Sequence, residues 1–210
     1  LFEDRLNSSA TNLSKALGDK FDVPKDRQFH GFDAYQKVLD AGVDLVIESL
    51  NLLLEHPSVR FVIAGAGSQI PLCHQLARDL PDGMVRFYSP WPVGETSPVL
   101  RSANLLVLPT KANQSLMSLP SKLLAYMLSG RPVLASADAG SDLTNLITQA
   151  ECGWVVAPER PDLLAAQLTE ILQLEPHELQ RRGENGRKYA LAHLTKSICL
   201  PEVIRILEDR

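Results

Sequence analysis

The sequence has little that would suggest a metal centre, a disulfide framework or a membrane span. Its three cysteines, Cys73, Cys152 and Cys199, are widely spaced and form no C-x-x-C pair. They predict the reduced thiols of a cytoplasmic protein. The five histidines show no metal-ligand spacing, and we expect neither a metal nor a cofactor. No apolar run reaches the roughly 18 residues that a transmembrane helix needs, so we expect no integral membrane segment.

A strong excess of charge of one sign is also missing. The chain has 21 Lys and Arg residues against 25 Asp and Glu, a net charge of -4. This balance argues against nucleic acid as a partner, because phosphate backbones are bound by clustered basic residues. The basic neighbourhood at 181–188 predicts a solvated helix face. The chain begins Leu1-Phe2 without a signal-peptide layout, and we interpret it as part of something longer.

What the sequence does have, from Ser58 onward, is an alternation of short apolar runs with segments of helical periodicity. Such alternation predicts an α/β fold with a doubly wound, Rossmann-like parallel sheet of five or six strands. The apolar runs suit strands that are covered on both faces. The predicted strands are 59–64, 84–88, 105–109, 132–137 and 153–157. The predicted helices are 70–80, 96–103, 121–129 and 142–150, followed by a helical C-terminal tail at 162–174 and 176–208.

The segment from Gly42 to His56 allows two interpretations. Residues 43–47 alone resemble a buried strand, but the longer segment places six apolar residues on one helical face: Val43, Val46, Ile47, Leu50, Leu53 and Leu54. We predict a helix over 42–56 that Pro57 ends. The residues before it differ in pattern from the rest of the chain. We predict a polar helix at 3–17, a short strand at 28–32 and a helix at 33–40.

Gly65 and Gly67 form a G-x-G turn after a predicted strand, where a dinucleotide fingerprint would lie. The third fingerprint position, however, holds Ile70 instead of Gly or Ala. The next strand, 84–88, ends without an acidic residue for a ribose. A nicotinamide site is therefore disfavoured here, and a tight turn explains the two glycines.

A second segment carries more chemistry. After the strand at 105–109 comes a stretch at 113–119 that we predict to be polar and irregular. Pro120, Ser121 and Lys122 then begin a helix. Proline suits the first helical turn, and the free N–H groups there, the hydroxyl of Ser121 and the charge of Lys122 suit a diphosphate. The alternative is a plain helix start with a surface lysine, and the spacing alone does not decide between them.

Five motifs, in order, resemble family-four glycosyltransferases of the colanic-acid and exopolysaccharide type. They are VRFVIAGAG at 59–67, VRFYSPWP at 85–92, LLVLPT at 105–110, LPSKLLAYMLSGRPVLAS at 119–136 and CGWVVAP at 152–158. The resemblance covers residues 42–210. It implies a GT-B enzyme, in which two Rossmann-like domains enclose the active site and the C-terminal one binds the nucleotide-sugar donor.

Site residues follow from this resemblance by position. Two glycines would border the donor, three residues would lie beside its base, and four would face its diphosphate and sugar; no catalytic residue is identified. They are, in that order, Gly65 and Gly67; Tyr88, Pro90 and Trp91; and Ser118, Pro120, Ser121 and Lys122.

The chain also departs from the family. Most relatives carry two glutamates seven residues apart, where this chain has Ser118 and Ala125, and Asp40 stands where a lysine would serve. We interpret the chain as lacking the acceptor-binding N-terminal domain of the family. We therefore expect a donor-binding domain that transfers no sugar by itself.

The first part of the chain has two further motifs, LFEDRLNSS at 1–9 and KFDVPKDRQFHGFDAYQKVLDAGVDLVI at 20–47. They resemble the nucleotide-binding domain of Gfo/Idh/MocA-type oxidoreductases, beyond its glycine fingerprint. The two resemblances overlap at 42–47, which implies a chimera: an oxidoreductase-like fragment at 1–41 and a glycosyltransferase domain at 42–210. We predict that Gln28–Phe32 supplies the strand that the glycosyltransferase fold needs before the helix at Gly42. Three functions stay open: a nucleotide-sugar-binding domain, a structural chimera without a ligand, and an NAD(P)-dependent oxidoreductase remnant.

Overall fold

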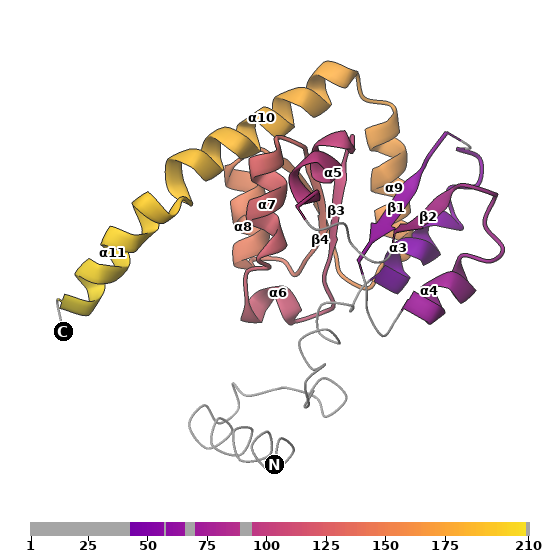
Figure 1. Cartoon of the computed structure of the whole chain (residues 1–210). Helices are drawn as coiled ribbons and strands as arrows, with labels where there is room; N and C mark the ends of the chain where they lie inside the picture. Colours follow the sequence, from indigo (N-terminus) through magenta and orange to yellow (C-terminus); the bar gives the residue numbers. More distant parts are fainter. Residues whose placement is uncertain (1–42, 57, 66–69, 89–93, 209–210) are drawn as a thin grey trace, which may run out of the picture.

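The protein is described here by a computed structural model, which covers residues 43–56, 58–65, 70–88 and 94–208 (Figure 1). Parallel strands alternate with helices along these ranges, as the sequence predicted. The strands are β1 (Phe61–Ala64), β2 (Val85–Tyr88), β3 (Leu106–Pro109), β4 (Val133–Ser136) and β5 (Gly153–Val156). The helices are α3 (Val43–Leu50), α4 (Ile70–Leu76), α5 (Thr96–Ser102), α6 (Gln114–Met117), α7 (Lys122–Ser129), α8 (Asp142–Gln149), α9 (Pro161–Leu172), α10 (Pro176–His193) and α11 (Lys196–Glu208).

The core is built around β4, whose four residues are all buried. It pairs in parallel with β3 on one side and β5 on the other, so that Leu134 lies between Val107 and Trp154. Helices α7, α8 and α10 cover one face of this sheet, and α3 and α9 cover the other. This two-sided cover explains why the strand consists only of small and apolar residues.

The described strands form two sheets instead of the single sheet that the sequence predicted. β1 pairs with β2, and β4 pairs with both β3 and β5, but no described strand joins β1 to β3. The apolar core is nevertheless continuous there, because Phe61 and Val107 both pack against the cluster that contains Val46 of α3. A right-handed crossover would place the strand before α3 beside β1. That strand was predicted at Gln28–Phe32, which lies outside the described residues, so this prediction stays open.

Two local predictions were wrong. Helix α3 ends at Leu50, well before position 57, and the chain continues in tight turns in which the N–H of Leu53 donates to the carbonyl of Leu50 at 3.0 Å. Leu54, predicted on the buried face, is 48% exposed. The stretch at 113–119 is not irregular throughout, because it contains the short helix α6.

The C-terminal tail is helical, as predicted. Helix α10 crosses the body of the domain and α11 extends away from it (Figure 1). The contact between α10 and the domain is very close: a Cβ atom built on Gly183 would lie 2.2 Å from the carbonyl oxygen of Gly130. One built on Gly186 would lie 2.9 Å from the Cβ of Cys152. Glycine therefore sets the depth at which α10 packs.

Three other features of the described ranges bear on the expectations from composition. The thiols of Cys73 and Cys152 are buried, and that of Cys199 is exposed. No helix in these ranges is long and apolar enough to cross a membrane. No cluster of three or more potential metal ligands occurs in the part of the chain that the structure describes.

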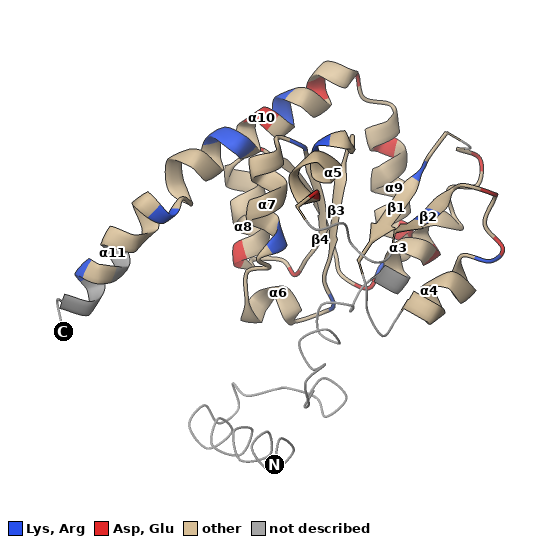
Figure 2. Cartoon of the chain, viewed as in Figure 1, with Lys and Arg blue, Asp and Glu red and all other residues tan. Residues whose placement is uncertain are grey.

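The basic residues of α10 are blue in Figure 2; Arg181, Arg187 and Lys188 are exposed, as predicted, but Arg182 is only partly exposed. Its guanidinium lies over the ring of Trp154, 4.5 Å from the ring centroid. It also donates to Glu178 Oε1 at 3.0 Å and to the carbonyl of Gly153 at 3.2 Å. The side chain thus ties α10 to β5.

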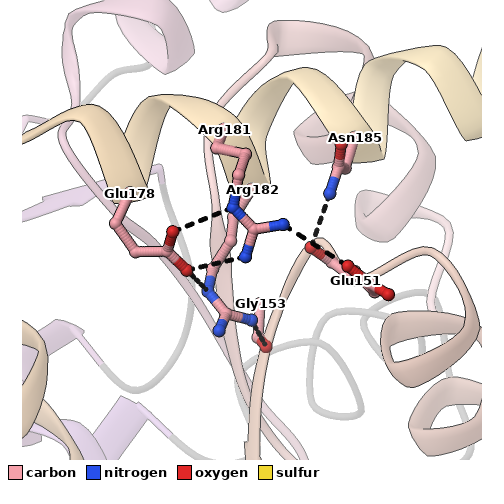
Figure 3. Close-up of polar contacts among 6 residues, drawn as sticks. All are labelled: Glu151, Gly153, Glu178, Arg181, Arg182 and Asn185. Atoms are coloured by element: carbon pink, nitrogen blue, oxygen red, sulfur yellow. Dashed lines mark hydrogen bonds and ion pairs between the residues drawn. The ribbon is translucent and has the colours of Figure 1, made fainter.

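Arg181 completes this polar cluster at the end of α8 (Figure 3). It donates to Glu178 through two nitrogens at 2.8 Å and forms a longer ion pair with Glu151 at 3.4 Å. Asn185 donates to the carbonyl of Glu151 at 3.5 Å. These contacts hold the turn between α8 and β5 against the tail helix.

Glu178 should make the stability of the domain depend on pH in the acid range. Its hydrogen bonds to Arg181, followed by the charges of Arg181 and Arg182, lower its pKa from 4.5 to about 2. The carboxylate is favoured in the folded state, so its contribution is complete above about pH 4.5 and is lost as the pH falls towards about 2. We expect Glu178→Gln to lower the melting temperature near neutral pH and to lose that effect in acid.

The measurement is the melting temperature by circular dichroism at several pH values across that window. Glu184→Gln is the matched control, since Glu184 is an exposed residue of the same helix whose carboxylate accepts a hydrogen bond from Gln180. A difference between wild type and Glu178→Gln that stays constant with pH would contradict the assignment.

Candidate functional site

The loops that follow β3 and β4 are joined by buried side-chain hydrogen bonds. Thr110 Oγ1 donates to the carbonyl of Ser136 at 2.5 Å, and Ser136 Oγ donates to the carbonyl of Thr110 at 3.0 Å. Both residues are at most 2% exposed. The carboxyl ends of adjacent parallel strands are where open α/β sheets bind ligands. This reciprocal pair fixes the backbone at that edge.

One step further along, Asp138 anchors α6. Its Oδ1 accepts from the N–H of Asn113 at 3.0 Å, and its Oδ2 accepts from Ser115 Oγ at 2.6 Å. The N–H of Asp138 donates back to Ser115 Oγ at 2.8 Å. Ser115 is 2% exposed, so this junction is buried at its centre. The loop after β3 is therefore held by the loop after β4.

Beyond α6 the chain presents polar groups that have no protein partner. Ser118, Ser121 and Lys122 are exposed, and their side chains make no hydrogen bond or ion pair within the described part of the chain. Half-buried Pro120 precedes α7, and its carbonyl accepts from the N–H of Leu123 at 3.0 Å. The first amides of a helix are free donors and carry partial positive charge. Hydroxyls, amides and an ammonium group thus gather on one anchored segment, which suits an anion.

A second group of predicted residues lies at the ends of β1 and β2. The N–H of Gly65 donates to the carbonyl of Tyr88 at 2.9 Å, and the side chain of Tyr88 is exposed. Gly65 has a φ of 145°, which favours glycine. Gly67, Pro90 and Trp91 lie outside the described residues.

The structure joins Gly65 to Tyr88 and places Ser118, Ser121 and Lys122 along one short segment, but no hydrogen bond joins these two groups among the described residues. Helices α4 and α6, which follow β1 and β3, lie at the same edge of the molecule (Figure 1). The two groups therefore belong to one edge, the carboxyl ends of the strands.

Sequence reasoning missed the residues that support this edge, namely Thr110, Ser115, Ser136 and Asp138. A usable signal was present, because Thr110 and Ser136 each stand at the carboxyl end of an apolar run. In a parallel sheet such positions meet at one edge. The partner of Ser115 could not be found this way, since it lies 23 residues away in an adjacent loop.

Helices on both faces of parallel strands, with unpartnered donors at the carboxyl ends, define a Rossmann-like α/β domain of the kind that forms half of a GT-B glycosyltransferase. Residues 35–174 match the family described as Glycosyl transferases group 1. This match covers the greater part of the chain, and the protein belongs to that family.

Individual relatives are distant in sequence. The probable glycosyltransferase WbjE of Pseudomonas aeruginosa is 21% identical over 134 residues, which are 64% of this chain and 33% of that protein. The chain thus spans only about a third of the length of this curated relative.

Solved structures show the shared fold. The Anabaena protein HepE, in complex with UDP-glucose, matches with a TM-score of 0.67 and 15% identity over 97% of this chain and 53% of its own. The C-terminal domain of the group 1 family protein LpcC from Francisella tularensis matches with a TM-score of 0.61 and 18% identity, over 76% of this chain and 82% of its own.

Proposed function

We propose that this chain is the domain of a glycosyltransferase that binds the nucleotide-sugar donor. The observation that carries the proposal is the set of exposed, unpartnered groups at Ser118, Ser121 and Lys122. They lie on a segment whose start is anchored through Thr110 and Asp138. A diphosphate offers the negative charge and the acceptor oxygens that such a segment lacks.

Two finer assignments belong to the same proposal. The Pro-Ser-Lys helix start at 120–122 favours a donor domain for exopolysaccharide synthesis of the colanic-acid type. Residues 1–41 are proposed to derive from an oxidoreductase-like domain and residues 42–210 from the transferase. The family match begins at residue 35 and so extends across this boundary. HepE, a similar fold, was solved with UDP-glucose, which supports a nucleotide sugar as the ligand class.

Replacing Lys122 with alanine should weaken nucleotide binding. The loss of one charge-assisted contact is worth about 1.5–3 kcal/mol, so we expect the Kd to rise about tenfold or more. The measurement is isothermal titration calorimetry with UDP, GDP, their hexose conjugates and NAD. Lys188→Ala, which removes an exposed lysine from α10, is the matched control and should leave the Kd unchanged.

The ligand series separates the alternatives. Binding of UDP- or GDP-sugars that depends on Lys122 supports the proposal. If wild type binds none of the nucleotides, a structural chimera explains the chain better. Binding of NAD alone would favour an oxidoreductase remnant.

A further inference from the structure

We propose that Asp138 is the positioning residue for the donor-binding segment, a role that rests on the proposed function. It stands on the loop after β4, while the residues proposed to touch the ligand follow α6. Both of its carboxylate oxygens are already occupied by the α6 segment. Asp138 therefore acts through α6 on the residues proposed to touch the ligand.

The carboxylate holds a backbone conformation that the segment disfavours. Asn113, which precedes α6, has a φ of 65°, a left-handed conformation that non-glycine residues rarely adopt. Its N–H is fixed by Asp138 Oδ1 at 3.0 Å. Ser115, two residues later, is 2% exposed and would otherwise bury its hydroxyl with fewer partners. One side chain thus secures the turn that begins α6 and the first residues of the helix.

Asp138 is itself fixed independently of its carboxylate. Thr144 Oγ1 donates to the carbonyl of Asp138 at 2.8 Å, and the N–H of Ser141 donates to the same carbonyl at 3.2 Å. Both partners lie at the start of α8. Because the main chain at 138 stays in place without the side chain, a substitution there should loosen α6 and spare the sheet.

The effect passes from α6 to the proposed ligand residues through the main chain. The N–H of Ser118 donates to the carbonyl of Gln114 at 3.3 Å, and the N–H of Lys111 donates to Gln114 Oε1 at 3.0 Å. A loosened α6 therefore frees Ser118 and the approach to Ser121. The ligand would then have to order this segment on binding, which lowers affinity.

The test compares Asp138→Ala and Asp138→Asn in the full chain by amide hydrogen exchange. We expect Asp138→Ala to speed exchange at 113–121 about tenfold or more, with β4 and α8 unchanged. Asn retains an oxygen for the N–H of Asn113 and should restore much of the protection. Asp79→Ala, which removes an exposed carboxylate from the turn after α4, controls for the change in charge.

Calorimetry with UDP and a UDP-sugar supplies the second readout, with about a tenfold weaker Kd expected for Asp138→Ala and partial rescue by Asp138→Asn. Unchanged exchange at 113–121 would overturn the proposal, as would faster exchange spread evenly over β3, β4 and β5. Unchanged affinity beside faster local exchange would also overturn it, because the segment would then not need Asp138 to bind. If wild type binds no nucleotide, the proposed function fails, and the exchange pattern alone decides whether Asp138 positions the segment.

Discussion

Replacing Gly183 with alanine is expected to destabilise the domain by about 2–4 kcal/mol, as overpacking at a site without room does. Alanine in a helix interior normally stabilises by about 1 kcal/mol relative to glycine, so the expected effect has the opposite sign. The added Cβ would lie 2.2 Å from the oxygen and 2.7 Å from the carbon of the Gly130 carbonyl. These are main-chain atoms, which cannot rotate away as a side chain can.

The clash can be relieved only by moving α10 away from the turn between α7 and β4. That movement would withdraw Ala190, which is fully buried, from the core that it shares with Cys152 and Met127. It would also lengthen the contact of Arg182 with Trp154. The loss therefore extends along the helix and is larger than the strain of one methyl group.

Urea unfolding followed by circular dichroism measures this effect. The pair Lys188→Ala and Lys188→Gly, at an exposed position in the interior of the same helix, isolates the intrinsic helix preference and should differ by about 1 kcal/mol. Gly186→Ala should destabilise the domain less than Gly183→Ala, because the nearest neighbour of its added Cβ is the side chain of Cys152, at 2.9 Å, and not the main chain. A Gly183→Ala protein as stable as wild type would show that α10 does not pack at this depth.

The strands could be predicted because each buried strand is a run of consecutive, mostly apolar residues. Each apolar run that predicted a strand contains the observed one, and β4, the most deeply buried, is the clearest example. The two ends of α7 could also be predicted from residues next to them in the sequence. Proline and serine precede Lys122, and Gly130 ends the helix with a φ of 73°, the left-handed conformation that glycine allows.

Pairing between distant segments could not be predicted in the same way. The position of Arg182 over Trp154 joins residues from different elements, and neither residue's neighbours in the sequence indicate the other. A basic run on a polar helix is usually solvated, and Arg181, Arg187 and Lys188 are exposed, so the local pattern failed for Arg182. The division of the described strands into two sheets is likewise a matter of which strands pair, and no single apolar run indicates its partner.

At the candidate site, the sequence predicted the residues that face solvent and missed those that hold them. Lys122 and Ser121 could be found because a helix start has a local signature. Helix α6 is too short for a periodic signal, and its anchor, Asp138, acts over 23 to 25 residues. Groups that would bind a donor can be recognised from their neighbours in the sequence, whereas the contacts that hold them in place join distant segments of the fold.

No measurable sugar transfer is expected from the 210-residue chain assayed by itself. Transfer requires an acceptor hydroxyl aligned with the donor and, in general, a base that removes its proton. The segment at 110–125, which carries the proposed donor groups, contains no Asp, Glu or His. The neighbouring carboxylate of Asp138 accepts two hydrogen bonds from the α6 segment, which holds it against the protein.

The surface beside the segment also lacks a partner in the described chain. Leu116, Met117 and Leu119 are 55%, 63% and 43% exposed, an apolar edge that an acceptor or a further domain would cover. Alignment of two reactants is worth about 7–11 kcal/mol of the barrier, so its loss lowers the rate by about five orders of magnitude or more. A donor domain alone should therefore bind without turning over.

The assay follows transfer of labelled sugar from UDP- and GDP-hexoses to lipid and glycan acceptors, with free sugar counted separately as hydrolysis. An intact two-domain group 1 glycosyltransferase, assayed with its own donor and acceptor, shows that the conditions support transfer. Donor binding without transfer is the expected result for this chain. Repeated turnovers onto any acceptor, lost in Lys122→Ala, would show that the acceptor site and its base lie within these 210 residues.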